Sequence, residues 1–80
     1  MVLITGGAGY IGSHLLLELT KVGYDVVVLD NLSNSSMGRL EHISEVLGMD
    51  FDFILGDVSD SEILGDVFKE FNIKTVFHLA

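Results

Sequence analysis

Three glycines spaced three residues apart, Gly6, Gly9 and Gly12, stand between an apolar run and a run of helical periodicity. Glycine lets the main chain turn sharply and lets a ligand come close to the backbone. The amide groups at the start of a helix lack backbone partners and carry partial positive charge, so a phosphate binds there. The spacing predicts a phosphate-binding turn over residues 5–12, and we expect Tyr10 and Ile11, which open the helix, to belong to the same site.

Asp30 extends this prediction from a phosphate site to a dinucleotide site. It ends the apolar run that follows the first predicted helix. A carboxylate at that place accepts hydrogen bonds from the two hydroxyls of an adenine ribose and repels a 2′-phosphate. No arginine stands next to Asp30, so the expected cofactor is NAD rather than NADP. The alternatives are a purely structural tight turn for the glycines and a turn aspartate for Asp30.

Further candidates for this site follow the ends of predicted strands. Asp57 is expected to accept a hydrogen bond from the adenine amino group, with Val58 packing on the ring, although Asp57 also suits a helix entry. Asn31, Asn34 and Ser35 are expected to line the ribose, although such residues are common in loops that bind nothing.

Metal and thiol chemistry find little support in the sequence. The chain has three histidines, His14, His42 and His78, and no cysteine. The histidines are isolated, and His14 has no second ligand one helical turn later, so structural roles are expected for all three. We predict neither a metal site nor a disulfide.

Charge and length limit the possible partners. The 80 residues carry 12 acidic and 4 basic side chains, for a net charge of −8. Nucleic-acid-binding proteins present Lys and Arg patches, so no nucleic-acid partner is expected. No apolar run approaches the roughly 20 residues of a membrane span, and no basic, apolar leader precedes Val2. We therefore expect a cytoplasmic protein with no membrane partner.

Four apolar runs alternate with three amphipathic runs along the chain. The predicted strands cover about residues 1–5, 24–30, 51–55 and 74–79, and the predicted helices cover about 10–21, 36–47 and a segment that begins at the capping box of Ser59 and Glu62. The expected buried faces are Ile11, Leu15, Leu19 and Val22 on the first helix, broadened by Leu16 and Leu17, and Ile63, Val67, Phe68 and Phe71 on the third.

Strands that alternate with helices at this spacing predict right-handed crossovers and a parallel sheet. The expected fold class is α/β, the N-terminal part of a Rossmann-type sheet with strand order 3-2-1-4. The order reverses between the first and fourth strands, and open α/β sheets bind ligands outside the carboxyl ends of the strands at that point.

The segment from Thr5 to His14 resembles the glycine motif of the extended short-chain dehydrogenase/reductase family. Within that family, residues 30–36 are similar to the 4-epimerases of UDP-sugars, and residues 56–58 and 77–80 fit the same pattern. The resemblance covers the whole chain and implies that Leu79 and Ala80 belong to the cofactor site. Leu79 departs from the aromatic residue common there in 4-epimerases. Leucine is usual in nucleotide-sugar dehydratases and uronate epimerases, which therefore remain alternatives.

The resemblance also implies a reaction. In such enzymes, NAD takes a hydride from C4 of a UDP-sugar while a tyrosine removes the hydroxyl proton, and the hydride then returns to the other face of the 4-keto sugar. The tyrosine belongs to a Tyr-x-x-x-Lys pair. The two tyrosines here, Tyr10 and Tyr24, are followed four residues later by His14 and Val28.

We therefore expect no catalytic residue in this chain. Residues 1–80 are expected to form a partial NAD-binding domain, the N-terminal piece of a longer enzyme, inactive without its catalytic and UDP-sugar-binding parts. The alternative from another class is a non-catalytic dinucleotide-binding module. The last predicted strand would be an open edge with Val76, Phe77 or Leu79 uncovered, which predicts self-association through residues 74–79.

Overall fold

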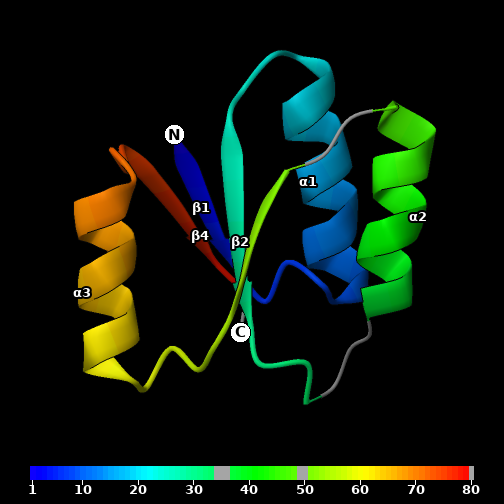
Figure 1. Cartoon of the computed structure of the whole chain (residues 1–80). Coiled ribbons are helices and arrows are strands. Elements are labelled where there is room, and N and C mark those ends of the chain that lie inside the picture. Colours follow the sequence, from blue (N-terminus) through cyan, green and yellow to red (C-terminus); the bar gives the residue numbers. More distant parts are fainter. Residues whose placement is uncertain (34–36, 49–50, 80) are drawn as a thin grey trace.

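The computed structural model describes residues 1–33, 37–48 and 51–79. Strands and helices alternate along the chain as predicted (Figure 1). The strands are β1 (Val2–Thr5), β2 (Val26–Asp30), β3 (Asp52–Leu55) and β4 (Thr75–His78), and the helices are α1 (Tyr10–Lys21), α2 (Met37–Leu47) and α3 (Ser61–Glu70). Each observed strand is shorter than its predicted range. Within the described residues, no helix is long and apolar enough to cross a membrane.

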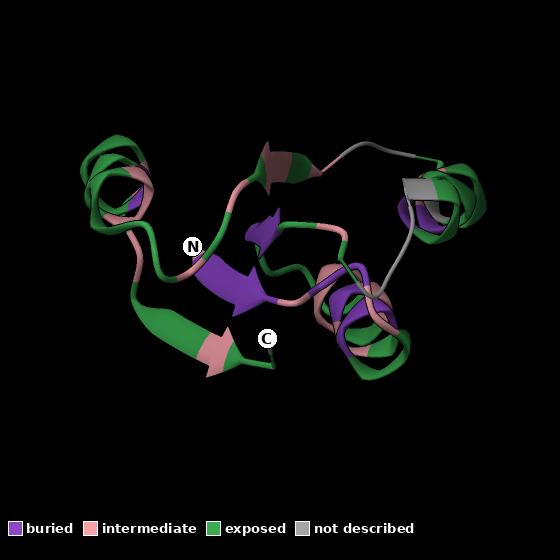
Figure 2. Ribbon diagram, turned by 90° about the horizontal axis from the view of Figure 1, so that it is seen from below, coloured by how far each residue is buried: buried purple, intermediate pink, exposed green. Residues whose placement is uncertain are grey.

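The four strands form one parallel sheet in the order β3-β2-β1-β4, which confirms the predicted order. Every residue of β1 and β2 is buried, whereas the residues of the outer strands β3 and β4 are exposed or only partly buried (Figure 2). Helices α1 and α2 cover one face of the sheet and α3 lies on the other (Figure 1). Burial on both faces explains why the two central strands are continuous apolar runs.

Helix α1 has the predicted bounds, and part of its predicted buried face is confirmed, since Leu15 and Leu19 pack against the core. Leu16 is fully buried, next to the buried Gly12 and Ser13. Ile11 and Val22, expected inside, are 69% and 70% exposed. The prediction was wrong for these two residues, because Gly12 and Leu16 face the interior instead and Val22 lies past the last helical residue, at the C-cap.

Helix α3 begins one residue later than the predicted capping box requires. The N-cap is Asp60, whose carboxylate accepts from the backbone amides of Glu62 and Ile63. The hydroxyl of Ser59 instead donates to Asp57 at 2.9 Å. Val67 is buried as predicted, but Phe68 is 50% exposed, which corrects its assignment to the inner face.

Candidate functional site

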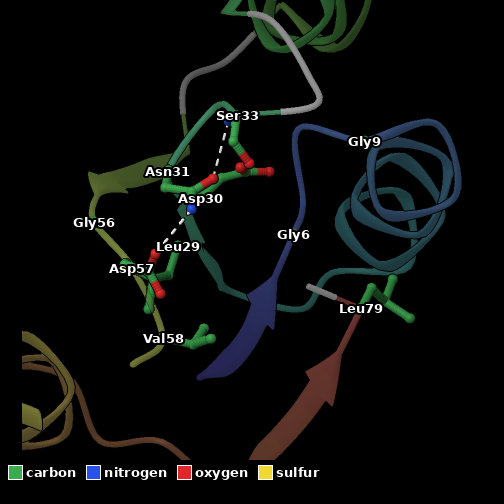
Figure 3. A pocket seen from close by; sticks show the side chains of 10 residues that line it. All are labelled: Gly6, Gly9, Leu29, Asp30, Asn31, Ser33, Gly56, Asp57, Val58 and Leu79. Carbon is green, nitrogen blue, oxygen red and sulfur yellow. Dashed lines mark hydrogen bonds between the residues drawn. The ribbon is translucent and has the colours of Figure 1, made fainter. Parts of the chain in front are cut away.

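A cavity of about 280 Å³ lies at the carboxyl ends of the strands (Figure 3). Its walls come from the segments at the ends of all four strands. The lining residues are Gly6, Gly9, Leu29, Asp30, Asn31, Ser33, Gly56, Asp57, Val58 and Leu79. The structure thus brings seven of the predicted site residues into one place: Gly6, Gly9, Asp30, Asn31, Asp57, Val58 and Leu79.

The turn after β1 takes its shape from two of the predicted glycines. Gly6 has φ +76°, in the left-handed region that favours glycine, and its amide donates to the carbonyl of Leu29 at 2.8 Å. Gly9 is the N-cap of α1, with no side-chain cap. A Cβ on Gly9 would meet only the carbonyl oxygen of Gly6, at 3.4 Å, so the space beside this residue belongs to the cavity.

Gly12 has a packing role outside the cavity. A Cβ there would lie 2.3 Å from the carbonyl oxygen of Gly6 and 2.7 Å from Cα of Gly7. The helix therefore packs closely on the turn itself. Sequence reasoning also missed Gly7, whose Cβ would lie 2.6 Å from a methyl carbon of Val28. The Gly-Gly pair at this turn was the available signal for that contact.

Asp30 joins the end of β2 to the glycine turn. Its Oδ2 accepts from the amide of Ala8 at 3.0 Å, and its Oδ1 accepts from the amide of Leu32 at 2.8 Å. The residue is only 9% exposed and lines the cavity. Its carboxylate therefore holds the glycine turn in its conformation. The position of Asp30 in the sequence did not reveal this role.

Asp57 joins the ends of β3 and β2. Its Oδ2 accepts from Nδ2 of Asn31 at 3.0 Å, and its Oδ1 accepts from the amide and the hydroxyl of Ser59, each at 2.9 Å (Figure 3 shows the Asn31 contact). The hydrogen bond from the backbone of Ser59, followed by those from its hydroxyl and from Asn31, lowers the pKa of Asp57. The oxygen of the Asn31 side chain accepts from the amide of Ser33 at 3.0 Å, which orders this loop.

Leu79, the residue after β4, forms one wall of the cavity. Its amide donates to the carbonyl of Thr5 at 2.9 Å, and its side chain is 42% exposed at the cavity. The next predicted residue, Ala80, lies outside the described residues, as do Asn34 and Ser35.

Tyr10 and Ile11 do not line this cavity. Tyr10 borders a second cavity of about 280 Å³ between α1 and α2, where its ring lies edge-on to that of His14 with centroids 4.7 Å apart. Ile11 is 69% exposed. A contribution of these two residues to the predicted site stays a prediction.

A metal site is not apparent in the part of the chain that the structure describes. There, no three side chains of the types His, Cys, Asp and Glu are grouped so that they could hold an ion. The site is instead a combination of helix N-terminus, carboxylates and amide donors, which suits a ligand with both phosphates and hydroxyls.

Comparisons relate the chain to enzymes that act on nucleotide sugars. The profile of the family described as GDP-mannose 4,6 dehydratase matches residues 3–80. UDP-glucose 4-epimerase of Bacillus subtilis is 51% identical over 79 residues, and that of Haemophilus influenzae is 49% identical. In both cases the match covers 99% of this chain and 23% of the relative, so the chain spans about a quarter of the length of these relatives.

Solved structures show the same relationship. A UDP-glucose 4-epimerase from Bifidobacterium longum in complex with NAD+ and UDP has a TM-score of 0.95 and 44% identity, over 99% of this chain and 24% of that one. The enzyme from Stenotrophomonas maltophila with bound NAD and formylated UDP-arabinopyranose has a TM-score of 0.94 and 40% identity, with the same coverage. The resemblance to sugar-nucleotide 4-epimerases inferred from the glycine motif and the segment after Asp30 is confirmed.

Proposed function

The chain belongs to the GDP-mannose 4,6 dehydratase family, and from this relationship we propose that it is the NAD-binding segment of a UDP-glucose 4-epimerase. The observation that carries the proposal is the junction of Asp30 with the glycine turn at one cavity. A carboxylate for the ribose and a helix N-terminus for the pyrophosphate are the two parts that an NAD site needs. The same fold is found in the B. longum epimerase solved with NAD+.

The chemistry of the cavity fits NAD. The open space at Gly9 would receive the pyrophosphate, Asp30 would accept from the ribose hydroxyls, and Asp57 with Val58 would border the adenine. Among the described lining residues there are two aspartates and no Lys or Arg, a composition unfavourable to the 2′-phosphate of NADP.

The proposed reaction belongs to the longer protein. When bound, NAD supplies a hydride acceptor and donor at C4 of the sugar, which allows UDP-glucose and UDP-galactose to interconvert through a 4-keto intermediate. The residues of this chain would bind and orient the adenine half of the cofactor. Because neither Tyr10 nor Tyr24 is followed by a lysine four residues later, we propose that the catalytic base and the UDP-sugar site come from outside residues 1–80, and that these residues alone are inactive.

The proposal includes a place in the cell and in metabolism. We assign the enzyme to the cytoplasm and to galactose metabolism, with NAD and a UDP-sugar as partners and with neither nucleic acid nor membrane among them. Leu79 supports a second candidate, another nucleotide-sugar enzyme such as a dTDP-glucose 4,6-dehydratase or a UDP-glucuronate 4-epimerase. The dehydratase description of the matching family is consistent with that candidate.

A chimeric enzyme tests the proposed function. The 79 residues of the B. subtilis epimerase that align with this chain would be replaced by the residues of this chain. We expect the purified chimera to carry NAD and to convert UDP-galactose to UDP-glucose, because half of the exchanged residues are identical. The measurement is the rate of UDP-glucose formation together with the NAD content.

The matched control is the same chimera with Gly9→Val, which we expect to fold but to carry no NAD. A chimera that keeps Gly9, folds and yet binds no NAD would contradict the proposed cofactor. A chimera that binds NAD but does not convert UDP-galactose would favour the second candidate.

A further inference from the structure

Side-chain hydrogen bonds join neighbouring strand ends around the cavity at three places. Asn31 and Asp57 join β2 to β3, and Asp30 joins β2 to the turn after β1 through the amide of Ala8. The third joins β1 to β4, where Oγ1 of Thr5 lies 2.6 Å from Nδ1 of His78. The first two involve residues placed at the proposed nucleotide site, whereas Thr5 and His78 do not line the cavity.

Thr5 connects two walls of the cavity. It is the last residue of β1, it precedes the turn residue Gly6, and it is only 3% exposed. It pairs with His78 in the β1–β4 ladder, and its carbonyl accepts the hydrogen bond from the amide of Leu79. The side-chain bond thus lies where β1 and β4 end, one strand continuing into the glycine turn and the other into Leu79.

Packing holds β4 less firmly than it holds the central strands. In the described sheet, β4 is an edge strand that pairs with β1. Thr75, Val76 and His78 are exposed, so packing restrains this strand less than it restrains the buried β1 and β2. A hydrogen bond to a buried side chain at its carboxyl end therefore limits how far Leu79 can move from the glycine turn.

We propose that Thr5 and His78 are positioning residues for the cofactor, which hold the Leu79 wall against the glycine turn. The inference rests on the proposed NAD-binding function. The pair acts on the side of the cavity between the turn and Leu79, beyond the adenine side formed by Asp57 and Val58. Loss of the pair should therefore weaken the binding of a ligand that extends past the adenosine more than it weakens the binding of adenosine monophosphate.

The chemistry of the pair defines conservative and disruptive variants. With the imidazole proton on Nε2, the Thr5 hydroxyl donates to Nδ1; with the proton on Nδ1, the hydroxyl accepts and can donate to the carbonyl of Phe77, 3.5 Å away. Either arrangement needs a hydroxyl at position 5 and a polar atom near Nδ1 at position 78. Thr5→Ser and His78→Asn keep these groups, whereas Thr5→Val and His78→Leu remove them with little change in volume.

Hydrogen exchange in the ligand-free chain tests the positioning directly. We expect Thr5→Val and His78→Leu to increase the exchange rate of the Leu79 amide several-fold, while Thr5→Ser and His78→Asn keep it close to that of the unchanged chain. The amide of Gly56, bonded to Asp30 at the other side of the cavity, is the internal reference and should not change. Equal Leu79 exchange in all five proteins would overturn the proposal.

Ligand titration separates positioning from a general loss of structure. With all variants verified as folded by circular dichroism, Thr5→Val and His78→Leu should raise the dissociation constant of ADP-ribose about three- to tenfold, the effect of one net hydrogen bond. The constant for adenosine monophosphate should stay the same, and the conservative variants should restore ADP-ribose binding.

The outcomes distinguish the two proposals. A parallel loss of affinity for both ligands would show general loosening and would overturn the positioning role. If the unchanged chain binds neither ligand, the proposed function fails, and the exchange of the Leu79 amide still decides whether Thr5 and His78 hold β4.

Discussion

The two aspartates at the cavity are held by uncharged donors. Asp30 accepts from the amides of Ala8 and Leu32, and Asp57 accepts from Ser59 and Asn31. In a chain of net charge −8, a basic field that attracts phosphate over long range is absent. An anionic ligand must therefore be bound by backbone amides at short range, which gives the glycine turn its importance.

The hydrogen bonds to Asp57 predict a dependence of stability on pH. They lower its pKa in the folded chain below the ordinary value of 3.8. A depressed pKa contributes stability above the unfolded-state value, and this contribution is lost as the pH falls through the folded-state value. Asp57→Asn should therefore flatten the decline of stability below about pH 3.8. Urea denaturation at a series of pH values measures this effect.

Asp25→Asn, at an exposed position directly before β2, is the control that removes the same charge. With this substitution, stability should fall at acidic pH nearly as steeply as it does in the unchanged chain. Identical pH profiles for Asp57→Asn and the unchanged chain would refute the role of these hydrogen bonds.

Single residues could be predicted from sequence where local spacing determines their place. Gly6, Gly9 and Asp30 follow from the order of strand, turn and helix, and all three line the cavity. The bonds from Ala8 to Asp30 and between Thr5 and His78 join residues far apart in sequence. Such pairs depend on which strands become neighbours and in which register, and no local pattern of residue types encodes that geometry.

At the scale of secondary structure, the N-terminal turn of α1 packs on the glycine turn through Gly12. Gly12→Ala would place a Cβ against backbone atoms of Gly6 and Gly7 that cannot move independently. We expect a loss of about 1–3 kcal/mol in the free energy of unfolding, the cost of overpacking, which exceeds the gain of up to about 1 kcal/mol in helix propensity. Chemical denaturation measures the difference.

Gly65→Ala in α3 is the matched control for this change. Apart from its chain neighbours and the backbone of its own helix, no atom lies within 4 Å of a Cβ at that position. The substitution should raise stability by about 0.5–1 kcal/mol, since alanine favours the helix and restricts the unfolded chain. Equal stabilisation by Gly12→Ala and Gly65→Ala would contradict the tight contact between α1 and the glycine turn.

Sequence periodicity predicted which elements exist better than it predicted how they are turned. The bounds of α1 were correct, yet Ile11 is exposed because the side of the helix with Gly12 packs on the turn, and Val22 is exposed at the C-cap, past the last helical residue. In α3, Asp60 replaced Ser59 as N-cap because Ser59 bonds to Asp57. The packing of Gly12 on the turn and the bond of Ser59 to Asp57 are contacts between segments, which a pattern within one helix does not contain.

At the scale of the molecule, β4 leaves an edge of the described sheet unpaired. Val76 is 46% exposed and Leu79 is 42% exposed along it. Exposed apolar strand edges recruit other chains, so we propose that this chain self-associates through β4. Light scattering should show a mass that increases with concentration, and Val76→Lys should reduce this increase because an edge lysine opposes strand pairing.

Val46→Lys, on the exposed side of α2, is the control for the added charge and should leave self-association in place. A monodisperse monomer at high concentration would contradict the proposal.

The central claim is that the glycine turn and Asp30 together bind the adenine half of NAD, and calorimetric titration with ADP-ribose tests it most directly. The unchanged chain should bind saturably, and Asp30→Ala should lose about 1–3 kcal/mol of binding free energy. Gly9→Val should stay folded, since a Cβ there meets only one atom at 3.4 Å, and should bind no ADP-ribose because its side chain fills the phosphate space. Undiminished binding by Gly9→Val would contradict the account.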